Sequence, residues 1–448
     1  MDRDSQPAQE TGPGREGPDT CLSTSLQGIA NKASREPKHR FRNLYRMLDE
    51  DFLHECWRRV SKSAACGVDR VSAQEYERDL AANIHDLVER LKQKRYRAKL
   101  VRRQWIPKGN GKLRPLGIPA VEDKLLQVAV AQILSAIFEQ DFLRCSYGYR
   151  PEVGAHDAVD KLTVKLQFGK YHHVVEVDLE NYFGTIDHGW LQRMLAERID
   201  DGPFLRLIGK WLKAGVLETD GQVIHPTTGT PQGGVVSPVL ANVYLHYVLD
   251  LWFHRRIVKR CQGEACLIRY ADDFVCAFER AEEADWFLVD LEARVGKFGL
   301  RLSPTKTRRL VFSREGDGKA SFDFLGFEYR WGQDRQGRPH LKRRTARKSL
   351  WASLRRFTDW CRSNRHRRLG DLFGELNRKL VGYYRYFGIY GNHPSLRQFH
   401  TAAVRTLYKW LNRRSQSQSY NWAGFRAVLQ HFEVPQPRVW RTTTQATR

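Results

Sequence analysis

Hydrophobic residues recur at helical spacing over much of the chain. Leu44, Met47, Leu48 and Phe52 form the first such stripe, and a second amphipathic stretch covers residues 73–94. Positions three and four residues apart share one face of a helix, so both stretches are predicted to be helical. The same spacing predicts helices over residues 123–139, 156–166, 187–195, 203–214, 238–253 and 282–298, and over three basic segments beyond about residue 340.

Strand-forming residues occupy the intervening segments. Residues 174–179 form a short apolar run, and residues 97–115 are extended and basic, with Asn110-Gly111 near their end. An Asn-Gly pair between extended runs predicts a β-hairpin. Residues 268–276 hold two more strand-like runs on either side of an Asp-Asp pair. Helices and strands mixed in this order predict an α/β core.

The two ends of the chain lack these patterns. Residues 1–36 are rich in Gly, Pro, Ser and Gln with few large apolar side chains. Such a composition buries too little apolar surface to offset the entropy of ordering, so we expect a disordered leader. Residues 416–448 predict a short polar tail that contains Pro435 and Pro437.

The composition adds a strong positive charge. The chain has 75 Lys and Arg against 51 Asp and Glu, which gives a formal net charge of +24. The basic residues run through the whole chain among aromatic ones, which favours nucleic acid over a membrane as the partner. A generally basic solvated surface is the alternative.

The cysteines and the hydropathy pattern exclude other classes of protein. The 8 cysteines show no zinc-site spacing, and no apolar run is long enough to span a bilayer. We therefore expect free thiols in a reduced cytoplasmic compartment and no membrane association.

The candidate chemistry centres on Asp272 and Asp273. Two adjacent carboxylates in a tight turn repel each other unless a divalent cation neutralises them, which predicts Mg²⁺ held by hard oxygen ligands. A turn that only caps two strands is the alternative, because Asp favours turns in general.

Asp178 supplies a third carboxylate at the end of the 174–179 run, upstream of Asp272. In a polymerase palm these two elements lie side by side, and two ions roughly 4 Å apart could activate a primer 3′-hydroxyl and stabilise a pyrophosphate leaving group. Alone, Asp178 is better explained as an ordinary strand-terminal residue. Between these elements, residues 228–242 combine a Gly/Pro loop with a helix start, which suits close approach to a template or nucleotide, or a simple structural turn.

Ordered motifs extend this pattern along the chain. They include Ser146-Tyr147-Gly148-Tyr149-Arg150-Pro151, Thr230-Pro231-Gln232-Gly233, Tyr270-Ala271-Asp272-Asp273 and Phe324-Leu325-Gly326-Phe327, with further motifs at residues 106–119, 178–179 and 299–307. The series resembles the reverse transcriptases encoded by bacterial group II introns, also called intron maturases. The resemblance covers about residues 40 to 440.

The resemblance implies a right-hand polymerase with an α+β palm. The N-terminal extension and fingers would occupy residues 37–170, the palm 171–335, and a three-helix thumb or X domain 336–415. Residues 382–387 look like part of that thumb. Nothing after residue 415 offers the Cys pairs and His-Asn arrangement of the HNH endonuclease that some relatives carry, so we expect none in the tail.

The resemblance also implies roles for individual residues. Asp178, Leu179, Asp272 and Asp273 would bind two Mg²⁺ ions, for which Mn²⁺ could substitute, and the three aspartates would be catalytic. Phe183 would exclude a 2′-hydroxyl, with core packing as its alternative. The nucleotide would contact Lys108, Lys112, Arg114, Phe183, Gln232 and Lys306, and the RNA template would contact Arg150, Gly233, Tyr383 and Arg385.

The implied activity is RNA-directed DNA polymerisation, with maturase activity that promotes splicing and retromobility of a group II intron. Its partners would be intron RNA, an RNA template with a DNA primer, dNTPs and a DNA target. The alternatives are a domesticated or defence-associated reverse transcriptase and an RNA-binding splicing cofactor that has lost polymerisation.

Overall fold

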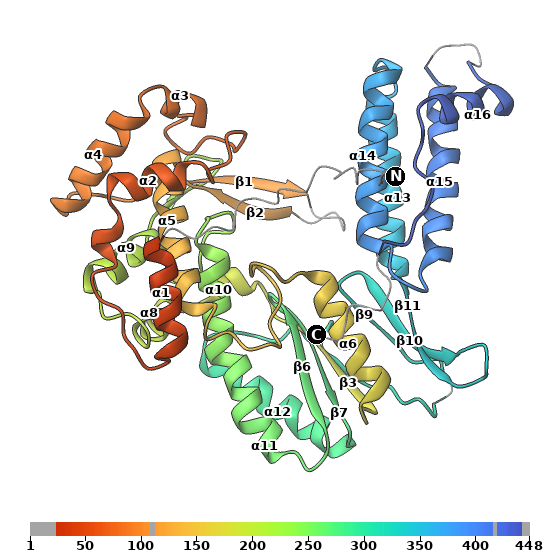
Figure 1. The fold of residues 1–448 in the computed structure, drawn as a ribbon, viewed down its shortest axis with the longest axis horizontal. Coiled ribbons are helices and arrows are strands. Elements are labelled where there is room, and N and C mark those ends of the chain that lie inside the picture. The colour runs from red at the N-terminus through yellow and green to blue at the C-terminus, as the bar shows by residue number, and fades with distance from the viewer. Residues whose placement is uncertain (1–23, 108–112, 317, 415–418, 441–448) are drawn as a thin grey trace, which may run out of the picture.

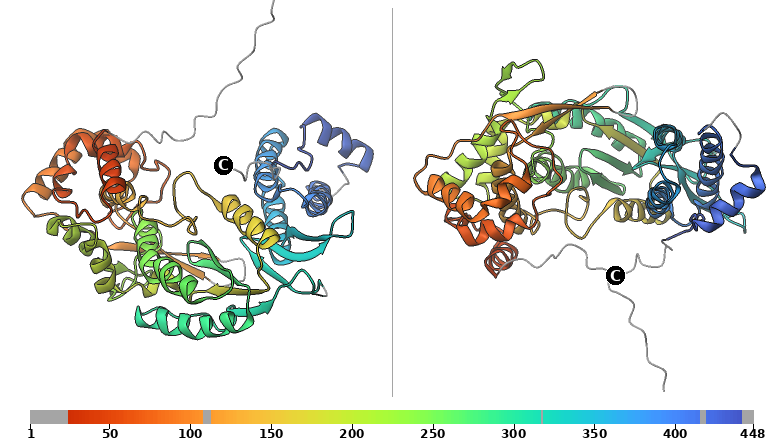
Figure 2. Two further views of the ribbon diagram at one scale, coloured as in Figure 1. Left: turned by 60° about the horizontal axis from the view of Figure 1, so that its bottom comes forward. Right: turned by 90° about the horizontal axis from the view of Figure 1, so that it is seen from above.

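The computed structural model describes residues 24–107, 113–316, 318–414 and 419–440. N-terminal helices gather at one end of the molecule, strands occupy the middle and the last long helices stand at the other end (Figure 1). Turned views show the same order along an arc (Figure 2).

The N-terminal end is a group of helices around α5 (Val121–Phe138), which is buried along almost its whole length. α2 (Glu50–Trp57) packs against α5. The stretch predicted as one helix over 73–94 is two helices, α3 (Ala73–Arg78) and α4 (Leu80–Lys92), and α3 begins at a capping box formed by Ser72 and Glu75.

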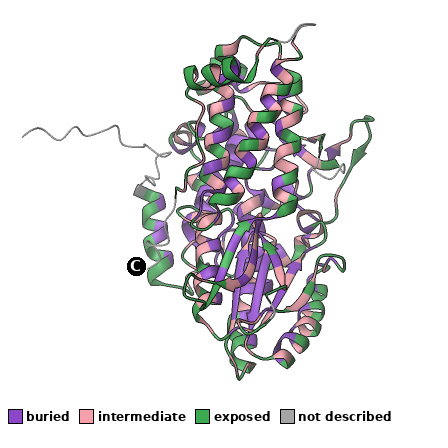
Figure 3. Cartoon of the chain, turned by 90° about the vertical axis from the view of Figure 1, so that its right-hand side faces the viewer, coloured by how far each residue is buried: buried purple, intermediate pink, exposed green. Residues whose placement is uncertain are grey.

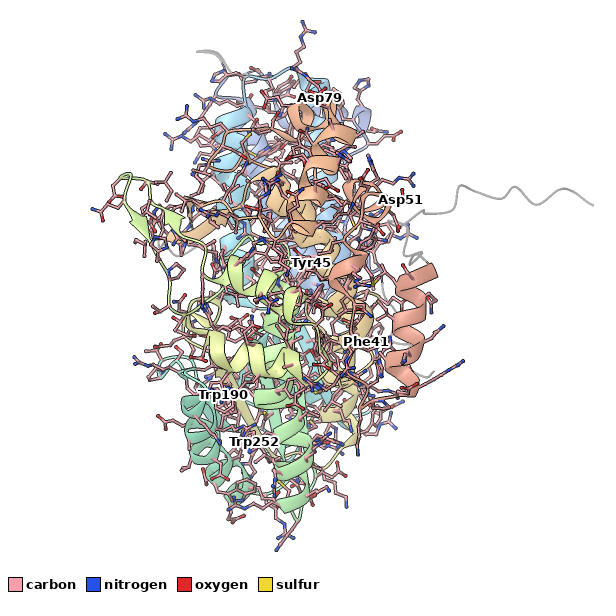
Figure 4. The ribbon with its side chains drawn as sticks, turned by 90° about the vertical axis from the view of Figure 1, so that its left-hand side faces the viewer. Phe41, Tyr45, Asp51, Asp79, Trp190 and Trp252 are labelled. Carbon is pink, nitrogen blue, oxygen red and sulfur yellow. The ribbon has the colours of Figure 1, made fainter. Side chains whose placement is uncertain are left out.

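The predicted disordered leader is wrong for its last part. α1 (Thr24–Arg35) packs on α5 and buries Leu26, Ile29, Ala30 and Ala33, which lie at helical spacing. The polar composition of residues 1–36 concealed this apolar stripe. Phe41, labelled beside α1 in Figure 4, is also buried and forms a β-bridge with Ile199. Residues 1–23 lie outside the described residues.

The predicted basic hairpin is confirmed. β1 (Val101–Pro107) and β2 (Leu113–Ile118) are antiparallel, and the predicted Asn-Gly tip lies outside the described residues. β1 also pairs in parallel with β4 (Val216–Leu217), which pairs with β5 (Val223–Ile224).

The central sheet joins two hydrophobic cores. Its strand order is β6-β7-β3-β8, from β6 (Ala265–Tyr270), β7 (Asp273–Phe278), β3 (His173–Asp178) and β8 (Arg308–Val311). Side chains alternate between the faces of a strand, so Phe274 and Cys276 enter the core shared with the N-terminal helices, while Val275 and Ala277 enter the core shared with the C-terminal half. α12 (Ala281–Lys297) packs on β3 and β7, and α6 (Ala155–Phe168) packs on β6.

Three short helices follow β3. They are α7 (Tyr182–Thr185), α8 (His188–Ala196) and α9 (Gly202–Leu212). α8 overlaps the predicted range 187–195, and Asp187 caps it, because its side chain accepts a hydrogen bond from the backbone N–H of Trp190.

The helix predicted over 238–253 is longer and irregular. α10 (Ser237–Leu245) continues through π-helical turns at His246–Asp250 and Phe253–Ile257 into α11 (Val258–Arg260). A π-turn holds an extra residue per turn and so redirects the side chains beyond it. Here the first π-turn brings Asp250 into the core, where it is 0% exposed.

A second antiparallel sheet precedes the C-terminal helices. Its order is β11-β10-β9, from β9 (Ser321–Phe324), β10 (Phe327–Gln333) and β11 (Pro339–Thr345). The prediction that the helical thumb begins at residue 336 is therefore wrong for residues 339–345, which form β11. Lys, Arg and His dominate the exposed positions of this strand, and only the alternate residues Leu341, Arg343 and Thr345 are buried.

The three predicted C-terminal helices are α13 (Arg347–Asn364), α14 (Leu369–Phe387) and α15 (His393–Leu411). Buried and exposed stripes alternate along them (Figure 3). The polar tail is wrong for α16 (Trp422–His431), which buries Phe425 and stacks Trp422 on Tyr408 at a ring-centroid distance of 4.0 Å. A few aromatic residues in an otherwise polar segment are thus enough to pack this helix against α15.

The cysteines in the described part of the chain are free, as expected. Among the described helices, none combines the length and apolar character needed to cross a bilayer.

Candidate active site

The structure brings two of the predicted carboxylates face to face. Asp178 ends β3 and Asp273 begins β7, and the strand register pairs them directly. Side chains of directly paired residues project from the same face of a sheet, with Cβ atoms roughly 4.5–5.5 Å apart. Like charges in such a pair repel, so this edge of the sheet suits a bound cation.

The turn between β6 and β7 carries the third carboxylate, Asp272. Ala271 precedes it with a φ of 57°, a left-handed conformation that is uncommon for alanine. The backbone of Gly148 packs against this turn so closely that a Cβ at that position would lie 2.3 Å from the Ala271 nitrogen. The turn is therefore fixed from behind by the 145–148 segment.

Burial and mutual repulsion make both turn carboxylates harder to ionise. Burial raises the pKa of Asp273 to about 7, and the carboxylates of Asp272, Asp178 and Glu176 act in the same direction. Burial also raises the pKa of Asp272, with a further contribution from Asp178 and an opposing one from Arg114. Carboxylates held together at this electrostatic cost are typical of catalytic or metal-binding sites.

Basic residues partly neutralise the same edge. The Lys306 ammonium donates to Asp178 Oδ2 at 2.8 Å, and Arg308 pairs with Glu176 on the same strand as Asp178. In the described part of the chain, Asp272 and Asp273 form no salt bridge. These two carboxylates therefore lack, among the residues described, the basic partner that Asp178 and Glu176 have.

The donor set fits a divalent cation, although it is not assembled around one point. Carboxylate oxygens are the hard ligands that Mg²⁺ and Mn²⁺ prefer. No group of three or more His, Cys, Asp and Glu side chains in the described ranges is arranged to hold a metal. Leu179 is buried and its backbone pairs with Leu302. Asp178 and Asp273 are thus the pair from which a metal site would be built, with Asp272 one residue away.

A loop over residues 228–234 connects neighbouring segments of this site through backbone hydrogen bonds. The backbone N–H of Thr230 donates to the Phe183 carbonyl at 2.7 Å, and that of Gly229 donates to the Ile186 carbonyl at 2.7 Å. On the other side, the N–H of Gly117 in β2 donates to the Gln232 carbonyl at 2.6 Å. The loop therefore couples the hairpin of β1 and β2 to the segment that follows Asp178.

Gly233 is required at its position in this loop. Its φ is +108°, and a Cβ there would lie 2.6 Å from the Gly117 carbonyl oxygen. Only glycine allows both the conformation and the close approach to β2. The neighbouring Gln232 has a buried side-chain Oε1 with no hydrogen-bond partner among the described residues.

Aromatic rings stand beside the carboxylates. The Phe183 ring is half-buried and meets the Tyr149 ring edge to face at 6.3 Å between centroids. Tyr149 is 52% exposed, and its φ is 58°. Burial and the nearby Asp272 carboxylate raise the pKa of Tyr149, while Arg114 opposes the shift. Tyr149, Phe183, Arg114 and Asp272 therefore share one neighbourhood.

Several predicted site residues lie elsewhere or have internal partners. The Arg150 guanidinium donates to Glu139 at 2.8 Å and to the Ser146 carbonyl at 2.8 Å, so its groups are used within the fold. Tyr383 is half-buried and packs flat on Phe399 at 3.6 Å between centroids, against the core of the C-terminal helices. Arg385 on the same helix is exposed and lies over the Trp440 ring. Lys108 and Lys112 lie outside the described residues.

Sequence reasoning missed the contribution of Tyr149 and the buried pair of Arg269 and Asp250. Tyr149 lies in a recognised motif, but its position beside Phe183 depends on contacts between distant segments. Arg269 lies next to the Tyr-x-Asp-Asp turn, where a charged residue in an apolar strand was a usable signal. No sequence signal pointed to Asp250, because its burial beside Arg269 depends on the π-turn.

Comparison with known proteins places this geometry in a family. The profile of the reverse transcriptase (RNA-dependent DNA polymerase) family matches residues 106–329. Protein YkfC of Escherichia coli strain K12 is 34% identical over 344 residues, which cover 68% of this chain and 87% of that protein.

Intron proteins are also similar. The group II intron-encoded protein LtrA of Lactococcus lactis subsp. cremoris is 36% identical over 232 residues, which cover 50% of this chain and 38% of LtrA. A putative COX1/OXI3 intron 2 protein of Saccharomyces cerevisiae is 36% identical over 145 residues, 32% of this chain and 17% of that protein. The matches thus span well under half the length of these intron proteins.

Proposed function

This chain belongs to the reverse transcriptase family, and we propose that it extends a primer 3′-hydroxyl with dNTPs on an RNA template at Asp178, Asp272 and Asp273. The observation that carries the proposal is the register of β3 and β7, which sets Asp178 opposite Asp273 beside the Asp272 turn. An RNA-dependent DNA polymerase domain needs oxygen ligands for divalent cations, and the carboxylates at this edge are the ones from which such a site would be built.

Asp178 and Asp273 would hold the cations, and Asp272 would join them from the turn. Divalent cations at such a site lower the pKa of the attacking hydroxyl and stabilise charge on the leaving group. Lys306 pairs with Asp178 at 2.8 Å and would be freed when a cation takes that oxygen. Its ammonium would then be available to the departing pyrophosphate.

The surrounding residues would shape the nucleotide site. Arg114 extends from β2 close enough to lower the pKa of Asp272, and its guanidinium suits a phosphate oxygen. The Phe183 ring would lie under the sugar and exclude a 2′-hydroxyl. Gln232 offers a buried oxygen that has no hydrogen-bond partner within the described ranges, which suits the edge of the new base pair. In this assignment the central sheet is the palm, β1 and β2 are fingers, and α13 to α15 form the thumb or X domain.

We further propose that the natural RNA partner is group II intron RNA, whose splicing the protein would promote. The similarity to LtrA and to the putative COX1/OXI3 intron 2 protein supports this choice, as does the net charge of +24. The similarity to YkfC, whose name refers to no intron, keeps a domesticated or defence-associated reverse transcriptase as the second candidate.

The test of polymerisation is Mg²⁺-dependent primer extension with dNTPs on an RNA template. The parent is expected to extend the primer, and the double variant Asp272→Ala with Asp273→Ala is expected to lose at least about 100-fold, because metal ligands contribute more than the outer residues that orient them. If the parent binds RNA but does not extend, polymerisation is the wrong function.

The intron proposal needs a separate assay. Self-splicing of the intron RNA that flanks the coding sequence is measured at low Mg²⁺ with and without protein. A rate increase that Asp272→Ala with Asp273→Ala preserves supports a maturase, because RNA binding does not need those carboxylates. Absence of ribozyme sequence at the locus would favour the second candidate.

A further inference from the structure

A buried arginine lies directly behind the Asp272 turn. Arg269 belongs to β6 and is 0% exposed, as is its partner Asp250. Its guanidinium donates to both Asp250 oxygens, from Nε at 2.8 Å and from Nη2 at 2.5 Å. A two-point contact of this kind fixes the orientation of the guanidinium plane.

The remaining donors of Arg269 reach the elements around the turn. Nη1 donates to the Ala271 carbonyl at 3.0 Å and to Asn242 Oδ1 at 3.1 Å, while Nη2 donates to Ser146 Oγ at 2.7 Å. The Asn242 amide in turn donates to the Gly148 carbonyl at 2.7 Å. One guanidinium thus connects β6, α10, the π-turn and the 145–148 segment.

The contact with Ala271 links this network to the reactive edge. Ala271 is left-handed, and a non-glycine residue keeps that conformation only where its surroundings hold it. The Arg269 guanidinium donates to the Ala271 carbonyl, and the backbone of Gly148 packs too closely against Ala271 to leave room for a Cβ. The next residue is Asp272, so the backbone orientation of Ala271 sets the position from which the Asp272 side chain projects.

A purely structural role would not require these charges. Replacing a buried ion pair by apolar residues of similar size is often neutral or stabilising, because burying two charges is costly. The pair also depends on a π-turn, an irregularity that frequently occurs at functional sites.

From these contacts we propose that Arg269, held by Asp250, is a positioning residue that fixes the Asp272 turn for metal binding. It acts through the Ala271 carbonyl and does not touch substrate. The inference rests on the proposed polymerase function, and its test includes a readout that does not depend on activity.

The main experiment compares Arg269→Lys with a matched control, Arg198→Lys. Arg198 is also buried, at 3% exposed, and pairs with Asp141 while donating to the Ala33 carbonyl, remote from the carboxylates. For each variant the melting temperature, the kcat of primer extension and the binding of Mn²⁺ followed by electron paramagnetic resonance are measured.

Both variants are expected to melt at lower temperature than the parent. Only Arg269→Lys is expected to weaken Mn²⁺ binding and lower kcat, each about 10- to 100-fold, as for residues that orient metal ligands. Equal effects of the two variants on Mn²⁺ binding and kcat would overturn the proposal. If the parent binds Mn²⁺ but fails to extend a primer, the proposed function is wrong. The comparison of Mn²⁺ binding between the two variants then still tests whether Arg269 positions the Asp272 turn.

A second variant separates stability from positioning. Arg269→Met combined with Asp250→Leu removes both charges, and we expect a melting temperature close to that of the parent with weakened Mn²⁺ binding. Parent-like melting together with parent-like Mn²⁺ binding would show that the pair is structural only. If the double variant does not fold, the buried charges are essential to the fold, and the proposal is then decided by Arg269→Lys against Arg198→Lys.

Discussion

Single residues determine the electrostatics of the proposed site. The carboxylates of Asp178, Asp272, Asp273 and Glu176 lie along one edge, and only Asp178 and Glu176 have basic partners in the described ranges. Without a bound cation, ionised Asp273 should therefore destabilise the fold. The raised pKa of this residue turns that expectation into a pH-dependent measurement.

Asp273→Asn is expected to stabilise the metal-free protein at pH 8. The pKa of Asp273 is raised from 3.8 to about 7, so between these values the folded state binds more protons than the unfolded state. The free energy of unfolding of the parent therefore falls as pH rises through this window, and Asn removes the loss. Thermal melting should show a gain of about 1–2 kcal/mol at pH 8, after allowance for solvent at this edge, and a smaller gain at pH 5.

The control is Asp359→Asn, an exposed position in α13. It should change little with pH, and Mg²⁺ should reduce the gain of Asp273→Asn because the cation stabilises the parent. A gain that is equal at pH 5 and pH 8 would contradict the electrostatic explanation.

The sequence was most informative where chemistry is local. Asp272 and Asp273 are adjacent, and Asp178 ends an apolar run. Both features can therefore be recognised in the sequence without knowledge of the fold. The template contacts expected for Arg150 and Tyr383 stay predictions, and the structure adds internal partners for both residues, Glu139 and Phe399. Those partners come from packing between segments, which residue type alone does not reveal.

At the scale of elements, the 228–234 loop connects the hairpin of β1 and β2 to the segment after β3. Its backbone hydrogen bonds to Gly117, Phe183 and Ile186 are made at 2.6–2.7 Å. A shift of the loop would therefore move both sides of the proposed nucleotide site.

Gly233→Ala is expected to lower kcat/KM for dNTP incorporation by about 10-fold or more, because the new Cβ must displace the loop from β2. Gly221→Ala is the matched control, since Gly221 also has a positive φ, +88°, but no atom within 4 Å of the added Cβ. Both substitutions introduce backbone strain of about 1–3 kcal/mol. Steady-state kinetics and melting temperature separate the two effects.

Equal catalytic losses for Gly233→Ala and Gly221→Ala would show that strain alone is responsible. A parent-like kcat/KM for Gly233→Ala would mean that the loop does not shape the nucleotide site.

Elements with strong periodicity were predictable, and those with mixed patterns were not. The central strands and α13 to α15 follow clear apolar repeats. α1 and α16 were missed because each buries only a few apolar side chains within a polar segment. β11 was missed because basic residues occupy its exposed positions, and a basic segment beside basic helices looked continuous with them.

At the scale of the whole molecule, positive charge predominates, whereas the proposed site is acidic. The net charge is +24, and exposed arginines such as Arg397 and Arg405 line one face of α15. Such a distribution attracts a nucleic-acid backbone broadly while keeping carboxylates for the reaction.

RNA affinity is expected to fall steeply and log-linearly with salt concentration. Arg397→Ala with Arg405→Ala should reduce the slope of log K against log salt by about 1.4–1.8, if both residues contact phosphates. Arg255→Ala with Arg256→Ala removes the same charge from exposed positions in the helix after α10 and should change the slope less. Filter binding over a salt series makes the comparison, and equal slopes for all three proteins would contradict a role for this face of α15.

The family assignment rests on the match over residues 106–329 and on the central sheet, both of which lie within the reach of sequence patterns. Recognition of an intron RNA would also depend on surfaces outside residues 106–329 and the central sheet.

The most direct test of the central claim is single-turnover incorporation of one dNTP on an RNA-templated primer by Asp178→Asn. The parent and Asp359→Asn should incorporate at similar rates, whereas Asp178→Asn should be slower by at least about 100-fold with unchanged template affinity. A parent-like rate for Asp178→Asn would contradict the assignment of the paired carboxylates of β3 and β7 as the reaction centre.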